Sequence, residues 1–125
     1  MNIGTKKERD LVNYLNFNGF TAVRVTGSGG GTKNDRPDIL AGNKGDIYVI
    51  ELKSSSKDIV YLRKEQIKEL YRFADGFGAV PVVAVKFTYL PYCFMSSKDL
   101  TVTKGGNYTF NREKARNFKN KIILT

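Results

Sequence analysis

The chain has 125 residues, of which 41% are hydrophobic and 26% are charged. This length and composition predict one compact domain spanning residues 1–125, with a single core. The 21 Lys and Arg residues outnumber the 12 Asp and Glu residues, which gives a formal charge of +9. An excess of this size indicates a polyanionic partner, and nucleic acid is the first candidate.

Two residue types narrow the chemistry further. Histidine is absent, which excludes Ser-His-Asp and Cys-His nucleophiles, histidine general bases and His-ligated metal sites. The single cysteine, Cys93, cannot form an internal disulfide. No apolar run is long enough to span a bilayer and the N-terminal residues lack a secretory signal, so we expect a cytoplasmic protein without a membrane partner.

The first predicted element is a helix from residue 5 to about residue 18. Its apolar residues recur at helical spacing: Leu11, Val12 and Leu15. Glu8 falls on the same face as these residues, and an acid that faces the core needs a partner. The alternative is a capping box, in which Glu8 reaches back to the backbone amide of Thr5.

A strand is predicted over Phe20–Thr26 because its residues are rich in β-branched types. The segment 27–36 follows, with four glycines and few apolar groups. Its spacing matches neither the phosphate-binding GxxxxGK[ST] pattern nor the dinucleotide-binding GxGxxG pattern. Two interpretations stay open for this segment, a mobile loop or a plain flexible linker.

A hairpin is predicted next, with strands at Pro37–Ala41 and Asp46–Lys53. On the second strand, Glu51 and Lys53 share a face with apolar residues. Burying such groups costs several kcal/mol unless they are paired, protonated or bound to metal. Charged residues that are buried at this cost usually serve a function. The alternative interpretation is that Glu51 and Lys53 form an exposed cross-strand ladder of charges on the surface of the sheet.

The second half predicts a helix over residues 62–74, a central strand over 79–87 and a strand returning over 89–95. A strand, a helix and a further strand in this order indicate a crossover connection. From Ser96 onward we expect a short helix or turn, a hairpin at 104–107 and a basic tail over 112–121. Most of the net positive charge lies in this half, because residues 63–125 hold 12 basic and 5 acidic residues.

In chain order the candidate residues read Glu8, Pro37-Asp38 and Glu51-Leu52-Lys53. This is the PD…ExK pattern of metal-dependent nucleases. Carboxylate oxygens can hold one or two Mg²⁺ ions, which polarise a phosphodiester and lower the pKa of a bound water. The lysine supplies a positive charge that orients this water or stabilises the developing negative charge. No histidine is required for this chemistry.

The chain resembles the archaeal Holliday-junction resolvase family, cellular or viral, over roughly residues 3–110. Beyond the nuclease pattern, the resemblance rests on Glu8-Arg9, Ala22-Val23-Arg24, Ser28, Arg63-Lys64-Glu65-Gln66, Phe73-Ala74 and Val85-Lys86. It implies an α/β fold, namely a restriction-endonuclease-like single domain with a central mixed β-sheet flanked by helices. The glycine-rich segment holds fewer basic residues than the family would lead one to expect.

The resemblance also implies the roles of individual residues. The metal ligands would be Glu8, Asp38, Glu51 and the backbone carbonyl of Leu52. The catalytic set would be Glu8, Asp38, Glu51, Lys53 and Ser28. The DNA-binding residues would be Arg9, Arg24, Lys33, Arg36, Arg63, Lys64 and Lys86. The cofactor would be Mg²⁺, with Mn²⁺ able to substitute.

The function implied is resolution of four-way DNA junctions by symmetric paired nicks, carried out by a homodimer in recombination and repair. Two other interpretations remain open from the sequence. One is a restriction-type or repair-type DNA endonuclease of the same fold, because fold and motif do not determine the substrate. The other is a non-catalytic DNA-binding protein whose acidic residues serve structure.

Overall fold

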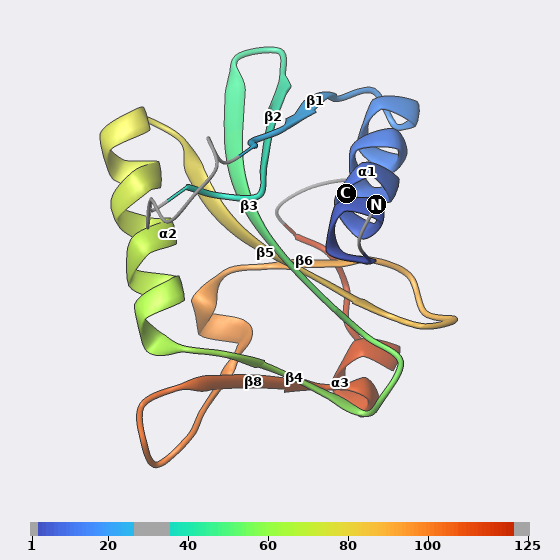
Figure 1. The fold of residues 1–125 in the computed structure, drawn as a ribbon, viewed down its shortest axis with the longest axis vertical. Helices are drawn as coiled ribbons and strands as arrows, with labels where there is room; N and C mark the ends of the chain where they lie inside the picture. Colours follow the sequence, from blue (N-terminus) through green and yellow to red (C-terminus); the bar gives the residue numbers. More distant parts are fainter. Residues whose placement is uncertain (1–2, 27–35, 122–125) are drawn as a thin grey trace.

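A computed structural model describes residues 3–26 and 36–121 of the chain. The described chain forms a mixed α/β domain with a central sheet between two helices, as predicted (Figure 1). Its elements are α1 (Ile3–Phe17), β1 (Thr21–Arg24), β2 (Ile39–Asn43), β3 (Asp46–Ser55), β4 (Ile59–Leu62), α2 (Lys64–Phe77), β5 (Val80–Phe87), β6 (Cys93–Met95), the 3-10 helix η1 (Ser97–Asp99), β7 (Thr101–Val102), β8 (Tyr108–Asn111) and α3 (Arg112–Arg116). None of the helices within these ranges is long and apolar enough to cross a membrane.

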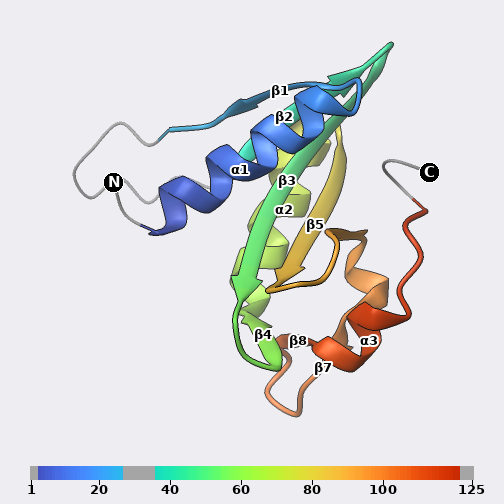
Figure 2. The ribbon, with the colours of Figure 1, turned by 90° about the vertical axis from the view of Figure 1, so that its right-hand side faces the viewer.

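The central sheet has the strand order β1-β2-β3-β5-β6. Strands β3 and β5 are parallel, and every other neighbouring pair in this sheet is antiparallel. The connection from β3 to β5 passes through β4 and α2, which is the predicted crossover. Helices α1 and α2 lie on opposite sides of the sheet (Figures 1 and 2).

The sheet therefore separates two apolar layers. On β5, Val82 and Ala84 belong to the layer that contains the buried face of α1. Val83 and Val85 belong to the layer that contains the buried face of α2. This alternation follows from the period of two in a strand and explains why β5 is apolar on both sides.

The first helix is confirmed, but the capping box is wrong. Helix α1 already includes Ile3, so Thr5 lies inside the helix rather than at its N-cap. The carboxylate of Glu8 instead pairs with the guanidinium of Arg24 on β1.

The predicted hairpin is confirmed, and its turn joins β2 to β3. Lys44 and Gly45 both have positive φ in this turn, which is the geometry that a type I′ two-residue hairpin turn requires.

A second, three-stranded sheet with the order β4-β8-β7 was not predicted. Strand β4 takes up Leu62, the first residue of the predicted helix, so α2 begins at Lys64 and extends to Phe77 instead of spanning 62–74. The side chain of Gln66 accepts a hydrogen bond from the backbone N–H of Arg63 at 2.9 Å and thereby caps α2. The hairpin at 104–107 is confirmed as the connection between β7 and β8.

Arg112 joins the second sheet to the rest of the domain. Its guanidinium donates hydrogen bonds to the backbone carbonyls of Ser56 (3.2 Å), Lys57 (2.8 Å) and Thr88 (2.9 Å). It also lies 5.2 Å from the ring centroid of Phe87. The side chain is only 15% exposed, so these carbonyls have little access to water if the guanidinium is lost.

We expect Arg112→Lys to lower the free energy of unfolding by about 2 kcal/mol, because an ammonium group cannot reproduce the planar set of donors. Chemical denaturation monitored by circular dichroism measures this change. Arg116→Ala is the matched control, since it removes an exposed arginine from the same short helix. If the Arg112→Lys variant were as stable as the wild type, the hydrogen bonds of the Arg112 guanidinium would make no net contribution to the free energy of unfolding.

Candidate active site

Asp38 and Glu51 are brought together by the pairing of β2 with β3. Ile39 pairs with Ile50 in an antiparallel register. The backbone N–H of Asp38 donates to the carbonyl of Ile50 at 2.9 Å, which ties the residue just before β2 to β3. Asp38 and Glu51 line the same cavity, and they are close enough for the charge of Asp38 to raise the pKa of Glu51.

The local hydrogen bonds hold Asp38 in one orientation. Its Oδ2 atom accepts a hydrogen bond from the backbone N–H of Leu52 at 2.8 Å. Its own carbonyl accepts from the N–H of Val25 at 2.9 Å, which ties the residue to the chain that follows β1. Among the described residues, Glu51 has no hydrogen-bond or ion-pair partner, so its carboxylate is available to a ligand.

Burial and like charge raise the pKa values of both acids. The pKa of Asp38 is raised to about 6, mainly by burial and also by the negative charge of Glu8, although the hydrogen bond from Leu52 acts against this shift. The pKa of Glu51 is raised to about 8, mainly by burial and also by the negative charges of Asp38 and Glu8. The positive charge of Lys53 lowers the pKa of both acids. Two acids and one lysine thus interact at a single site.

Lys53 follows Glu51 on the same face of β3, as the alternation predicted. The alternative of an exposed cross-strand ladder of charges is wrong, because Glu51 and Lys53 are only partly exposed and lie beside buried apolar residues of β5. The register partners of Glu51 and Lys53 on β5 are Val83 and Val85, which carry no charge. On the β5 side, the neighbours of the charged pair are therefore apolar.

Glu8 approaches the site from α1. Its Oε1 atom lies 3.1 Å from Nε of Arg24, and each side chain is about a quarter exposed. Within residues 3–26 and 36–121, no three acidic or thiol side chains are gathered so as to hold a metal ion. The structure thus brings Asp38 and Glu51 together and holds Glu8 nearby on Arg24. A metal-binding role for Glu8 stays a prediction.

A cavity of about 170 Å³ opens beside the two acids. It is lined by Arg36, Asp38, Glu51, Arg63, Gln66, Glu69 and Leu70. Gln66 and Glu69 were not singled out from the sequence. Gln66 and Glu69 follow Arg63 by three and six residues, so helical spacing places them on one face of α2. This spacing is the sequence pattern from which both residues could be predicted. Glu69 is close enough for its charge to raise the pKa of Glu51.

Two of the predicted DNA-binding residues lie at this cavity. Arg63 lines it from the start of α2. Arg36 lines it as well and is exposed, while its Nη1 atom donates a hydrogen bond to the carbonyl of Thr26 at 2.9 Å. Arg24 lies at the site through its ion pair with Glu8. These arginines give the site a positive border around its acidic centre.

The remaining predicted residues are placed differently. The backbone N–H of Lys64 is bonded to the side chain of Asn107 at 3.0 Å, at the β7–β8 turn. Lys86 donates to the carbonyl of Phe87 at 3.1 Å, and burial lowers the pKa of its ammonium group. Arg9 lies on α1. The predicted residues Ser28 and Lys33 fall outside the described residues.

The donor set at Asp38 and Glu51 fits a hard divalent cation. Both side chains offer carboxylate oxygens, which are the ligands that Mg²⁺ prefers. Their raised pKa values show that the two negative charges are costly when no cation is near. A bound divalent cation would offset this cost, and the backbone carbonyl of the adjacent Leu52 is a further oxygen donor.

A model of the archaeal Holliday junction resolvase family matches residues 1–124 of the chain. The chain belongs to this family. The crossover junction endodeoxyribonuclease Hjc of Methanocaldococcus jannaschii is 35% identical over 108 residues, which cover 86% of this chain and 75% of that protein. A crossover junction endodeoxyribonuclease of Sulfolobus islandicus rod-shaped virus 1 is 42% identical over 75 residues, covering 60% of this chain and 61% of the viral protein.

A solved structure of a related resolvase has the same fold as this chain. The structure of Archaeoglobus fulgidus Hjc, a Holliday junction resolvase from an archaeal hyperthermophile, superposes with a TM-score of 0.82 at 33% sequence identity. The match covers 93% of this chain and 94% of that one. The predicted family and the predicted fold class are therefore confirmed.

The raised pKa of Glu51 predicts how stability depends on pH without metal. A folded-state pKa above the ordinary value stabilises the fold below the ordinary pKa, and this contribution is lost as pH rises to about 8. We therefore expect the melting temperature of the wild type to fall, relative to Glu51→Gln, across this pH range. Scanning calorimetry in chelator measures the difference, and Asp46→Asn, at the far end of β3, is the control. Parallel curves for wild type and Glu51→Gln would contradict the assignment.

Proposed function

We propose that this resolvase-family protein is a Mg²⁺-dependent endodeoxyribonuclease that cuts four-way DNA junctions by paired symmetric nicks in recombination and repair. The class of enzyme is supported by the family and by the names of its relatives. The observation that carries the mechanism is the placement of Asp38 and Glu51 at one cavity, with Lys53 on the same strand face as Glu51. Mn²⁺ would substitute for Mg²⁺. We also propose that the protein acts in the cytoplasm of an archaeal cell, where a cellular gene or a viral gene would supply it.

Asp38 and Glu51 would hold the metal through their carboxylates, together with the backbone carbonyl of Leu52. When bound, a divalent ion supplies charge stabilisation to the scissile phosphate and a water of lowered pKa. The N–H of Leu52 fixes the orientation of Asp38, so the donor set needs little rearrangement. Cleavage by in-line attack of water leaves 5′-phosphate and 3′-hydroxyl ends.

Lys53 supplies a positive charge that acts on both acids. Its charge already lowers the pKa values of Asp38 and Glu51. In the complex its ammonium group would donate to the attacking water or to a non-bridging phosphate oxygen, where negative charge develops. Its fixed position on a central strand limits the reorganisation needed during the reaction.

Arg24 links DNA binding to the third acid. In the structure its guanidinium is paired with Glu8 at 3.1 Å. A DNA phosphate is a competing anion for the same guanidinium, since arginine binds phosphates and carboxylates with the same planar set of donors. If Arg24 bound a phosphate instead, the carboxylate of Glu8 would be released. The charge of Glu8 already raises the pKa values of Asp38 and Glu51.

We expect Asp38→Asn and Glu51→Gln each to lower the single-turnover rate of junction cleavage by roughly 10³-fold or more, because each removes an oxygen anion from the reacting centre. Junction binding should persist, since neither change removes a cation. Denaturing gels measure cleavage, and gel shift in the presence of Ca²⁺ measures binding. Asp46→Asn is the control for loss of one acid from β3. Retained cleavage by the Glu51→Gln variant in a pure preparation would refute the proposed site.

Two opposed nicks require two active sites, and we propose that a homodimer supplies them. Helix α2 packs on β3 and β5, and it leaves apolar side chains of β1 and β3 exposed on the same face of the sheet. Val23 is 54% exposed, Ile47 is 42% exposed and Phe77, at the end of α2, is 49% exposed. An apolar surface beside the active site is a suitable surface for a second copy of the chain.

The dimer proposal predicts that Val23→Glu combined with Phe77→Glu yields a monomer, because the change buries charge in an apolar contact. Sedimentation equilibrium should then give a mass near 14.1 kDa instead of twice that value. Tyr61→Glu, at a 66% exposed residue of β4, is the control. A wild-type protein that is monomeric at micromolar concentration, with or without junction DNA, would refute the proposal.

A further inference from the structure

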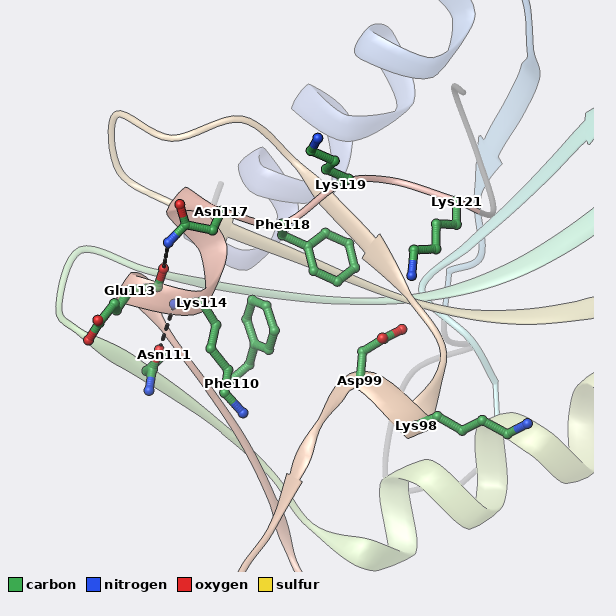
Figure 3. A pocket seen from close by; sticks show the side chains of 10 residues that line it. All are labelled: Lys98, Asp99, Phe110, Asn111, Glu113, Lys114, Asn117, Phe118, Lys119 and Lys121. Atoms are coloured by element: carbon green, nitrogen blue, oxygen red, sulfur yellow. Dashed lines mark hydrogen bonds between the residues drawn. The ribbon is translucent and has the colours of Figure 1, made fainter.

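A second basic surface lies away from the two acids. A cleft of about 850 Å³ opens between η1, β8, α3 and the residues that follow α3 (Figure 3). We call it the lysine cleft. Its lining residues are Lys98, Asp99, Phe110, Asn111, Glu113, Lys114, Asn117, Phe118, Lys119 and Lys121. Four of these ten residues are lysines, and they come from three different segments of the chain.

The four lysines of the lysine cleft outnumber its two acids. Asp99 accepts a hydrogen bond from the backbone N–H of Ser96 at 3.3 Å, in the turn that starts η1. The carboxylate of Glu113 points away from the centre of the cleft (Figure 3). Within the part of the chain that the structure describes, the ammonium groups of Lys98 and Lys121 have no hydrogen-bond or ion-pair partner. The cleft therefore presents unpaired positive charge.

The walls of the lysine cleft are held by specific contacts. The side chain of Asn120 accepts from the N–H of Phe94 at 2.7 Å and donates to the carbonyl of Tyr92 at 3.2 Å, so the tail is fixed to β6. The hydroxyl of Tyr71 accepts from the N–H of Ser97 at 2.9 Å, which fixes η1 to α2. The lysines therefore project from anchored backbone on both sides of the cleft.

The lysine cleft and the acidic site lie on different sides of α2. Gln66 and Glu69 face the cavity beside Asp38. Tyr71 leaves α2 on the other side, where it bonds to η1. An occupant of the cleft would therefore not touch the cutting centre, and the cleft must be explained by a contact that is remote from the reaction.

We propose that the lysine cleft binds the sugar–phosphate backbone of a junction arm at a distance from the cut. The proposal rests on the proposed function and names a further part of its substrate. Duplex DNA presents a regular row of phosphates, which suits an open cleft with cations on both walls. A four-way junction has arms beyond the one that is cut, so such a contact favours the junction over a linear duplex.

The test compares two variants that lose the same charge. Lys98→Ala with Lys121→Ala removes one lysine from each wall of the cleft. The control, Lys44→Asn with Lys104→Ala, removes two exposed lysines from the β2–β3 and β7–β8 turns, and Asn tolerates the positive φ of position 44. Dissociation constants for a four-way junction and for a linear duplex of the same arm sequence are measured in chelator across a range of salt concentrations.

We expect the cleft variant to bind the junction roughly tenfold more weakly than the control at physiological salt. The log–log salt slope for the junction should decrease in magnitude by about 2, because two phosphate contacts are lost. Binding of the linear duplex should weaken less than binding of the junction, because only the junction has a further arm that can occupy the cleft while another arm occupies the acidic site. In the wild type, bound junction should also protect Lys98 and Lys121, and not Lys44, from acetylation detected by mass spectrometry.

Two results would overturn the proposal. One is a cleft variant that matches the control in junction affinity and in salt slope, with no protection of Lys98 or Lys121 in the wild type. The other is unchanged junction binding together with loss of binding to labelled polyglutamate, which would assign the cleft to an acidic protein partner. If either result is obtained and the wild-type protein still binds and cuts junctions, the lysine-cleft proposal fails and the proposed function stands. If the wild-type protein neither binds nor cuts junctions, the lysine-cleft proposal and the proposed function are both refuted.

Discussion

The placement of two carboxylates at one cavity is the constraint on which the site depends. Asp38 and Glu51 come together because β2 pairs with β3 and because the backbone of Ile50 and Leu52 holds Asp38 in place. This arrangement opposes folding when no cation is present, since burial and like charge raise both pKa values. The apolar layer of β5 and α2 behind the strands supplies the stability that keeps the acids together.

The two-layer architecture also explains how the other charges are arranged. The sheet places α1 and α2 on opposite faces, so Glu8 and Arg63 reach the same region from different sides. Glu8 is held by Arg24 rather than by the two central acids. A competing phosphate at Arg24 would change this arrangement, and substrate binding and completion of the acidic set would then be coupled through one guanidinium.

Much of the central sheet could be predicted, because its strands alternate or are apolar throughout and its turns carry glycine. Asp38, Glu51 and Lys53 could be placed for the same reason, since their spacing on a hairpin determines their faces. The second sheet could not be predicted, because Ile59–Leu62 is short and pairs with Tyr108–Asn111, almost fifty residues later. The partners of Glu8 and Glu69 also depend on tertiary packing, and local patterns favoured a capping box that the structure does not form.

The most direct test of the central claim follows the cut on every strand of one substrate. A four-way junction is labelled on each strand in turn and incubated with the protein and Mg²⁺, beside linear duplexes of identical arm sequence. We predict nicks at symmetric positions on two opposed strands, with ligatable ends and with the linear duplexes left intact. Cutting of the linear duplexes at the same rate would indicate a restriction-type or repair-type nuclease, and no cutting with any divalent cation would contradict the account altogether.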